Sequence, residues 1–151
     1  MKNLLIIFTA LFITALISGC VSNIINLASE HDDLQAKQFK PKLHELSRIY
    51  VYRDEATGVL LKHPVYIDDI KVGTIDHCSY VYTDLKAGEH KISTINKGVH
   101  TDYIKIATDP GKVYFIELEL TIHGPNFVKR DDNKSKPSIL NCPLAELEYK
   151  F

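Results

Sequence analysis

Histidines and acids are the first side chains to consider for chemistry, because imidazole and carboxylate groups bind metal ions and transfer protons. The chain has seven histidines, and His90, His100 and Asp102 lie on two consecutive segments that alternate like strands. Across neighbouring strands they would supply the two-histidine, one-acid ligand set of a metal-dependent hydrolase. Their spacing matches no zinc pattern, and adjacent His77 and Cys78 point to opposite faces of an extended backbone. We therefore expect ordinary turn and edge histidines, with no metal and no cofactor.

Nucleophile and phosphate motifs are also missing from the sequence. There is no Gly-x-Ser-x-Gly run and no glycine-rich phosphate loop. The paired acids Asp68-Asp69 and Asp131-Asp132 fall in expected turns, where two carboxyl groups are rarely held apart across a substrate. The sequence therefore predicts no catalytic residues and no enzymatic activity.

Cys20 is the one residue whose neighbours indicate a definite reaction. It follows Ile17-Ser18-Gly19 at the end of an apolar stretch, Leu4 to Leu16, which begins after Lys2. That stretch is too short for an ordinary membrane span and is typical of an export signal. The run resembles a bacterial lipobox, which directs diacylglyceryl transfer to the cysteine thiol and cleavage just before it. The alternative is a plain signal peptide with a chance cysteine at its end.

On the lipobox interpretation, the acylated cysteine, carrying chains such as palmitate, becomes the first residue of the mature protein. We expect a signal peptide at 1–19, a lipidated tether and approach segment at 20–46, and one folded domain at 47–151. Val21-Ser22 lacks the aspartate that commonly retains lipoproteins at the inner membrane. We therefore expect anchoring at the outer membrane, facing the periplasm, with an envelope protein or a glycan as partner.

The two remaining cysteines, Cys78 and Cys142, form a candidate disulfide. Paired cysteines usually bridge in an oxidising compartment. The alternative is two independent buried thiols, because their Cα separation cannot be obtained from the sequence.

Composition excludes one class of partner and favours one class of fold. With 18 basic and 19 acidic residues in 151, the chain offers no electrostatic case for nucleic acid. Seven or so short alternating segments separated by turns predict a mainly β domain, a single antiparallel β-sandwich. The expected strands are 48–53, 64–67, 71–75, 79–83, 90–95, 103–107 and 113–122.

The flanking segments carry weaker patterns. A short helix is expected at 32–39, before Lys40-Pro41. Gly124 to Pro137 is charged and proline-flanked, which predicts a mobile recognition loop. For 138–151 we expect a strand and then a short C-terminal helix from Pro143.

Four tyrosines form the candidate binding surface. Tyr50 and Tyr52 share one face of an expected strand, and Tyr80 and Tyr82 share a face of another. If exposed, these rings would make a platform for a glycan or a peptide. The alternative, which the sequence favours, is that they pack against the sandwich, as half-buried tyrosines often do in sheets.

An ordered series of short motifs resembles a known family. The series comprises Ala36-Lys37-Gln38-Phe39, the strand Arg48 to Arg53, Val65-Tyr66-Ile67-Asp68 with Val72-Gly73, and Gly88-Glu89-His90. It is similar to the DUF2846 family of bacterial lipoproteins, and its turns look like those of the related PEGA type of sandwich module. The resemblance covers about 33–122 and implies a small PEGA- or prealbumin-like β-domain of unknown function.

The resemblance transfers no catalytic residue, since the family has none established. Asp69 departs from the pattern, because the family usually has glycine there, and this puts the geometry of that turn in question. The combined expectation is a membrane-anchored, non-enzymatic binding or scaffolding module. The alternatives are a small envelope hydrolase or metal-dependent enzyme, and a surface-displayed binder.

Overall fold

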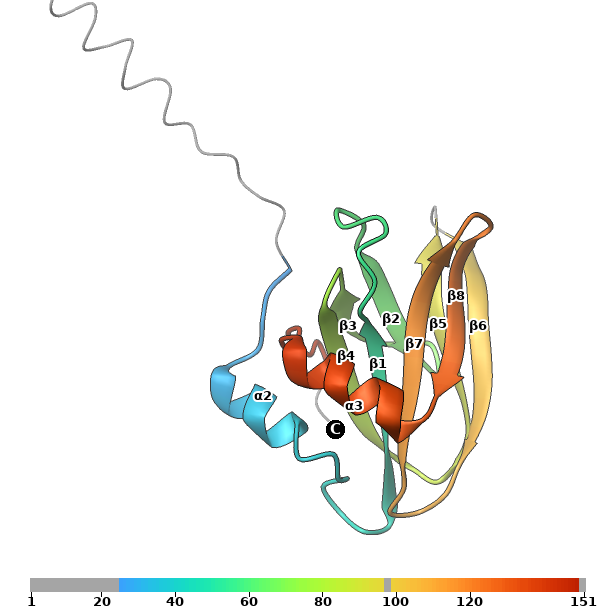
Figure 1. The fold of residues 1–151 in the computed structure, drawn as a ribbon. Helices are drawn as coiled ribbons and strands as arrows, with labels where there is room; N and C mark the ends of the chain where they lie inside the picture. The colour runs from blue at the N-terminus through green and yellow to red at the C-terminus, as the bar shows by residue number, and fades with distance from the viewer. Residues whose placement is uncertain (1–24, 97–98, 150–151) are drawn as a thin grey trace, which may run out of the picture.

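The computed structural model describes residues 25–96 and 99–149, which fold into eight strands and two helices (Figure 1). The helices are α2 (Glu30–Ala36) and α3 (Asp132–Asn141). The strands are β1 (Leu46–Arg53), β2 (His63–Ile67), β3 (Ile70–Ile75), β4 (Ser79–Lys86), β5 (Gly88–Asn96), β6 (Val99–Thr108), β7 (Val113–Thr121) and β8 (Gly124–Arg130). The mainly β fold predicted from the sequence is confirmed.

The strands form two four-stranded sheets, in the orders β4-β1-β7-β8 and β3-β2-β5-β6. Strand pairs within the sheets are antiparallel except β1 and β7, which run parallel with Arg48 opposite Val113. The wholly antiparallel sandwich expected from the sequence therefore needs this correction. A parallel pair requires a long crossover, and here the whole β2–β6 segment provides it.

Alternation along the strands builds the core between the sheets. On β1, Ile49 and Val51 point into this core, where they meet Val65 and Ile92 of the other sheet. Tyr50 and Tyr52 point the opposite way, as the period of two requires. The first sheet thus has apolar side chains on both faces, and its outer face needs a cover.

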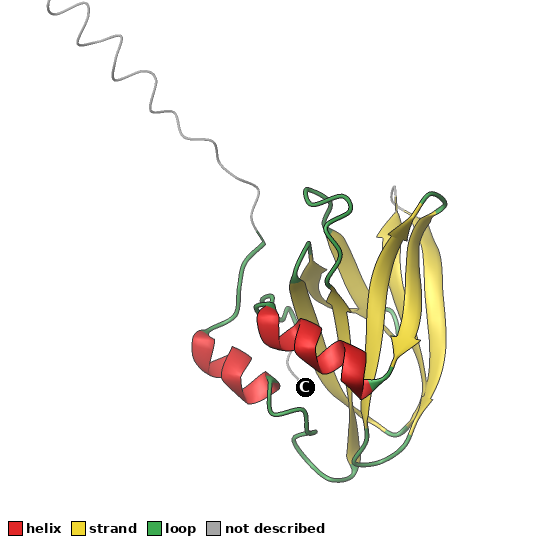
Figure 2. Cartoon of the chain, in the orientation of Figure 1, coloured by secondary structure: helices red, strands yellow, loops and turns green. Residues whose placement is uncertain are grey.

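Helices α2 and α3 supply that cover and lie on the same side of the molecule (Figure 2). Ala36 of α2 and Ile139 of α3 are fully buried on this face. Glu117 of β7 is also buried and forms ion pairs with Arg130 and with Lys134 of α3. Glu117 therefore lies on a covered face of the sheet, where two cations neutralise its charge.

The segment Gly124 to Pro137 is not a loop, and the sequence expectation for it was wrong. It forms β8 and the first part of α3, with Pro137 inside the helix. The Asp131 side chain caps the helix by accepting a hydrogen bond of 3.0 Å from the Lys134 N–H. The C-terminal helix thus ends at Asn141 and does not begin at Pro143. Few apolar residues mark α3 because it buries small side chains, Ser135 and Ser138, beside Ile139.

The described part of the approach segment, from residue 25, packs on the sandwich. Asp33 of α2 accepts hydrogen bonds from the Tyr80 hydroxyl (2.8 Å) and from the Leu144 N–H (2.9 Å). Its other oxygen pairs with Lys37. One carboxylate therefore ties α2 to β4 and to the C-terminal segment.

A disulfide joins Cys78 to Cys142, with the Cα atoms 4.9 Å apart. It connects the turn before β4 to the end of α3, and thus fastens residues 143–149 beside the sheet. The turn at Asp68 and Asp69 contains only these two residues between Ile67 and Ile70. Both have positive φ, 49° and 65°, which is the geometry of a type I′ hairpin.

Candidate functional site

Strand β4 lies at one edge of its sheet, and the C-terminal segment covers only part of that edge. The Tyr80 N–H donates to Pro143 O (3.3 Å), and the Ala145 N–H donates to Tyr80 O (2.9 Å). Residues 146–148 then leave β4, since Leu147 bridges to Gly73 of β3. Antiparallel alternation directs the backbone groups of Tyr82 and Asp84 outward, as it does those of Tyr80.

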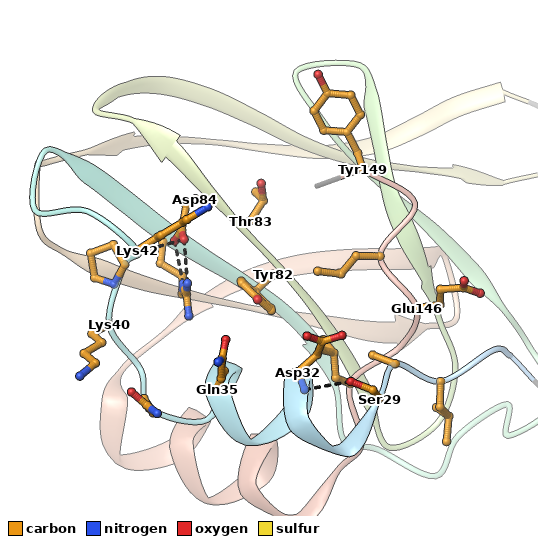
Figure 3. Close-up of a pocket in the computed structure, with 17 residues that line it drawn as sticks. Ser29, Asp32, Gln35, Lys40, Lys42, Tyr82, Thr83, Asp84, Glu146 and Tyr149 are labelled. Atoms are coloured by element: carbon orange, nitrogen blue, oxygen red, sulfur yellow. Dashed lines mark hydrogen bonds and ion pairs between the residues drawn. The ribbon is translucent and has the colours of Figure 1, made fainter. Parts of the chain in front are cut away.

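A groove of ≈ 540 Å³ runs along this uncovered stretch, and we call it the edge groove. Its walls are α2, the connection from α2 to β1, the edge of β4 and the C-terminal segment (Figure 3). The lining residues are Leu27, Ala28, Ser29, Asp32, Gln35, Gln38, Lys40, Pro41, Lys42, Arg48, Tyr82, Thr83, Asp84, Leu144, Glu146, Leu147 and Tyr149.

A buried ion pair forms one end of the groove. Arg48 donates from Nε and Nη2 to the two oxygens of Asp84, each at 2.7 Å. The guanidinium also lies 4.3 Å from the centroid of the Tyr82 ring. Burial by itself lowers the pKa of Arg48, but hydrogen bonds to Asp84 and Tyr50 outweigh it and hold that pKa above its ordinary value. The pair stays ionised and rigid, and positions the β4 edge.

Thr83 lines the groove and has a buried, unsatisfied hydroxyl. The residue is only 3% exposed, and its Oγ1 has no hydrogen-bond partner among the residues the structure describes. Buried polar groups are normally hydrogen-bonded. The Thr83 hydroxyl is therefore an exception, and protein atoms cover it from the groove itself.

Charges of opposite sign lie in different parts of the groove. Lys40 and Lys42 come from the connection before β1, whereas Asp32 and Glu146 come from α2 and the C-terminal segment (Figure 3). The Lys42 N–H also donates to the Asp84 carboxylate at 3.1 Å. This arrangement offers hydrogen-bonding edges and fixed charges, which are groups that can recognise a ligand.

The four tyrosines proposed from the sequence do not form an exposed binding surface. Tyr50, Tyr52 and Tyr80 are buried beneath the helices, and only Tyr82 is half-buried and reaches the edge groove. Burial raises the pKa of Tyr50 and Tyr52 to about 12. The buried rings thus have the packed arrangement that the sequence favours over an exposed platform, because α2 and α3 occupy the face that they share.

The histidine and acid set does not converge. His90 pairs with Ile106 across β5 and β6, whereas Asp102 pairs with Thr94 and His100 with Ile95. Four residues along a strand separate His90 from the level of Asp102, about 13 Å, which is far beyond metal-bond reach. His90 instead bonds Asp68 (2.7 Å) and Lys86 O (2.8 Å) and closes a turn.

Within the described ranges, the cluster with metal-ligand geometry is Asp54, Cys78 and Cys142. Both thiols of that cluster are used in the disulfide, which leaves a single carboxylate and no ligand set. Cys20 and the preceding run that resembles a lipobox lie outside the described residues. In the described part of the chain, the helices are too short or too polar to cross a bilayer.

Comparison with known proteins agrees with this architecture. Residues 44–130 match the family described as "Protein of unknown function (DUF2846)". The chain belongs to the DUF2846 family. A protein of Haemophilus influenzae (strain ATCC 51907 / DSM 11121 / KW20 / Rd), described as "Uncharacterized protein", is 33% identical over 137 residues, covering 88% of this chain and 80% of that protein.

The DUF2846 match spans β1 to β8 but ends before α3 and begins after α2. The sandwich is therefore the family feature. Two walls of the edge groove, α2 and the C-terminal segment, come from outside the matched residues.

Sequence reasoning missed Arg48, Asp84, Thr83 and Gln35 as site residues. Arg48 carried one usable signal, a charge on the same strand face as Tyr50 and Tyr52. Such a charge in a buried strand predicts a partner. The identity of that partner, Asp84, depends on the register between β1 and β4, which cannot be obtained from a local sequence pattern.

Proposed function

We propose that this protein is a membrane-anchored envelope lipoprotein whose β-sandwich binds a short extended segment of another envelope protein in the edge groove. The observation that supports the binding role is the edge of β4 at Tyr82 and Asp84, which no backbone group of the described residues pairs with and which lines the edge groove. Main-chain groups at a sheet edge pair with an added strand, and side-chain pockets then select its residues.

The chain already uses this mode of pairing on itself. Residues 143–145 add to β4 beside Tyr80 as a short parallel bridge, and then depart. An incoming segment of three or four residues would continue the same edge past Tyr82 and Asp84. Its charged side chains would meet Lys40 and Lys42 at one end and Asp32 and Glu146 elsewhere in the groove.

A peptide fits this groove better than a glycan does. Sugars stack on free aromatic faces, but Arg48 already lies over the Tyr82 ring and Tyr50 lies 5.7 Å from its centroid. Other recognition groups in the groove include the backbone donors and acceptors of β4 and the Gln35 side chain. These groups favour an occupant with its own regular backbone.

The anchor part of the proposal is supported by the Ile17-Ser18-Gly19-Cys20 run. Cys20→Ser removes the acylated thiol and should move the protein from the membrane fraction to the soluble envelope fraction. Two acyl chains or more give stable anchoring, whereas none leaves only surface contacts. Unchanged membrane association of Cys20→Ser would refute lipidation as the means of attachment.

The binding part is tested by selecting displayed random decapeptides on the purified full chain carrying Cys20→Ser. Selected peptides should shift the amide resonances of Tyr82 and Asp84. Gln35→Trp, which fills the groove from α2, should weaken their binding about tenfold or more, equal to about 1.4 kcal/mol. Lys105→Trp, at an exposed site on β6, is the matched control and should change nothing.

Backbone-methylated copies of the same peptides separate strand addition from side-chain capture. Methylation on the edge-facing amides should abolish binding, because it removes the donors that pair with β4. Equal binding of methylated peptides, or equal effects of Gln35→Trp and Lys105→Trp, would contradict recognition at the β4 edge.

A further inference from the structure

Exposed apolar side chains gather at one end of the sandwich. Val59, Leu60 and Leu61 lie in the β1–β2 loop, and Ile122 lies in the β7–β8 turn; we call these two segments the apolar tips. Leu60 is 93% exposed and Ile122 is 96% exposed. Single exposed apolar residues are ordinary on a protein surface, but four of them on two neighbouring tips form an exposed apolar patch.

The two apolar tips are in contact with each other. The Leu120 N–H, just before the β7–β8 turn, donates to the Glu55 carboxylate in the β1–β2 loop. A Cβ placed on Gly58 would meet Leu120 Cδ1 at 2.9 Å, so the loop backbone lies directly against the end of β7. Figure 1 shows both tips at the same end of the molecule.

Arg53 holds the β1–β2 loop in the shape that exposes its leucines. Its side chain is fully buried, and its guanidinium donates to the carbonyl oxygens of Thr57, Gly58 and Leu61. These bonds use backbone groups that would otherwise face water. The hydrogen bonds from Arg53 therefore hold the loop backbone in a conformation in which the side chains of Val59, Leu60 and Leu61 are exposed.

The N-terminal chain joins the domain at this same end. Ile25 and Asn26 line a small cavity together with Lys62, the residue after Leu61. Ile25, the first residue that the structure describes, is buried in the core between the sheets. From Cys20 to Ile25 there are five residue steps, which span at most about 18 Å.

We propose that the apolar tips insert into the interfacial layer of the lipid bilayer that holds Cys20, so that the domain has a fixed orientation on the membrane. This inference rests on the lipid anchor proposed above. A tether this short keeps the tips at high effective concentration near the lipid surface. Apolar side chains on amphipathic surfaces enter about 5–10 Å into the headgroup boundary.

This orientation leaves the edge groove accessible. Asp84 and Tyr82 pair with Arg48 and Tyr50, which precede the end of β1, whereas the tips follow Arg53 at that end. The Lys40 and Lys42 end of the groove is therefore the end farther from the bilayer. An insertion at the other end of the sandwich would instead block Lys40 and Lys42.

The absence of tryptophan from the sequence provides a clean probe of this inference. We would place single tryptophans by Leu60→Trp, Ile122→Trp and, as the matched control, Leu43→Trp, and reconstitute each lipidated protein in phosphatidylethanolamine and phosphatidylglycerol vesicles. Leu43 is 51% exposed and lies in the connection from α2 to β1, and Figure 1 shows where this connection enters β1, at the end opposite the β1–β2 loop. Brominated acyl chains should quench the two tip tryptophans at least about threefold more than the control.

The outcomes separate this inference from the anchor. A protein that floats with vesicles but shows equal, weak quenching at positions 60, 122 and 43 overturns the insertion of the tips and leaves the anchor standing. A protein that fails to float overturns the anchor first. The tip tryptophans could instead show an emission maximum that shifts to the blue with protein concentration in detergent, and no quenching by brominated lipid. That result would mean that the tips contact a second copy of the protein, and it would overturn insertion. Adding Leu60→Asp to Ile122→Trp should reduce the quenching, because it places a charge at the same end.

Discussion

The Arg48 guanidinium and the Asp84 carboxylate pair across β1 and β4 through two hydrogen bonds of 2.7 Å, with both side chains less than a tenth exposed. Lys42 N–H adds a third contact to the same carboxylate. Asp84 therefore holds the edge of β4 beside the connection from α2 to β1. The same contacts contribute to the stability of the domain and to the shape of the edge groove.

Asp84→Asn should destabilise the protein by about 3 kcal/mol or more, because it leaves the buried Arg48 charge without its counter-charge. Urea unfolding measures this loss. Asp132→Asn, which removes an exposed ion pair with Lys136, is the control and should cost less than about 1 kcal/mol. Equal losses in the two variants would show that the Arg48–Asp84 pair is not a buried structural interaction.

Removal of the disulfide by Cys78→Ser with Cys142→Ser should lower the free energy of unfolding by about 4 kcal/mol, from the 64-residue separation it closes. Hydrogen exchange at the Tyr80 amide should accelerate as well, because residues 143–145 lose their attachment beside β4. Mass analysis without reductant should find the two cysteines linked. Two thiols that alkylate freely in the native protein would contradict the bond.

Asp69→Gly should be more stable than Asp69→Ala by about 1 kcal/mol, because residue 69 has a φ of 65° that glycine adopts without strain. Both variants lose the ion pair between Asp69 and Lys91 equally, so their difference isolates the backbone. Thermal or urea unfolding of the two variants gives the result. Equal stability would mean that the turn relaxes out of the type I′ geometry.

Alkaline conditions should unfold the domain as the buried tyrosines ionise. Burial raises the pKa of Tyr50 and Tyr52 from 10.0 to about 12, so the native state keeps phenolic protons that the unfolded state loses. The associated stability is therefore fully present below pH 10 and is lost as the pH rises from 10 toward 12. Two pKa units correspond to about 3 kcal/mol for each residue.

Phenolate absorbance followed together with far-ultraviolet circular dichroism tests this alkaline transition. The two signals should change together above pH 10, and Tyr50→Phe should flatten the loss of stability with pH. Tyr103→Phe, at an exposed position on β6, should leave the profile unchanged. Complete ionisation of the tyrosines near pH 10 with the circular dichroism retained would show that these hydroxyls are accessible in the native state.

Most strands could be predicted from the sequence, because alternation of apolar and polar residues is local. The run Arg48 to Arg53 and the turn before Val113 predict β1 and β7 within a residue or two. The β8–α3 segment could not be predicted in this way. Pro137 and the charges around it read as a loop, while α3 is stabilised by its Asp131 cap and by contacts of Ser135 and Ser138 with Tyr52 and Asp54.

The candidate site depends on contacts between residues far apart in the sequence. Arg48 and Asp84 are 36 positions apart, and Asp33 and Leu144 are 111 apart. Residue types alone did suggest that the tyrosines pack and that the histidines are structural, but not that α2, β4 and the C-terminal segment enclose a groove.

The sequence by itself determined the mainly β class, the positions of most strands and the expectation of a lipidated Cys20, since each follows from local period or a contiguous motif. The tertiary structure alone decided the parallel β1–β7 pairing, the helices that cover the tyrosine face, and the open edge at Tyr82 and Asp84. Strand order and register follow from the packing of the whole chain, because any alternating strand satisfies its local pattern beside several partners.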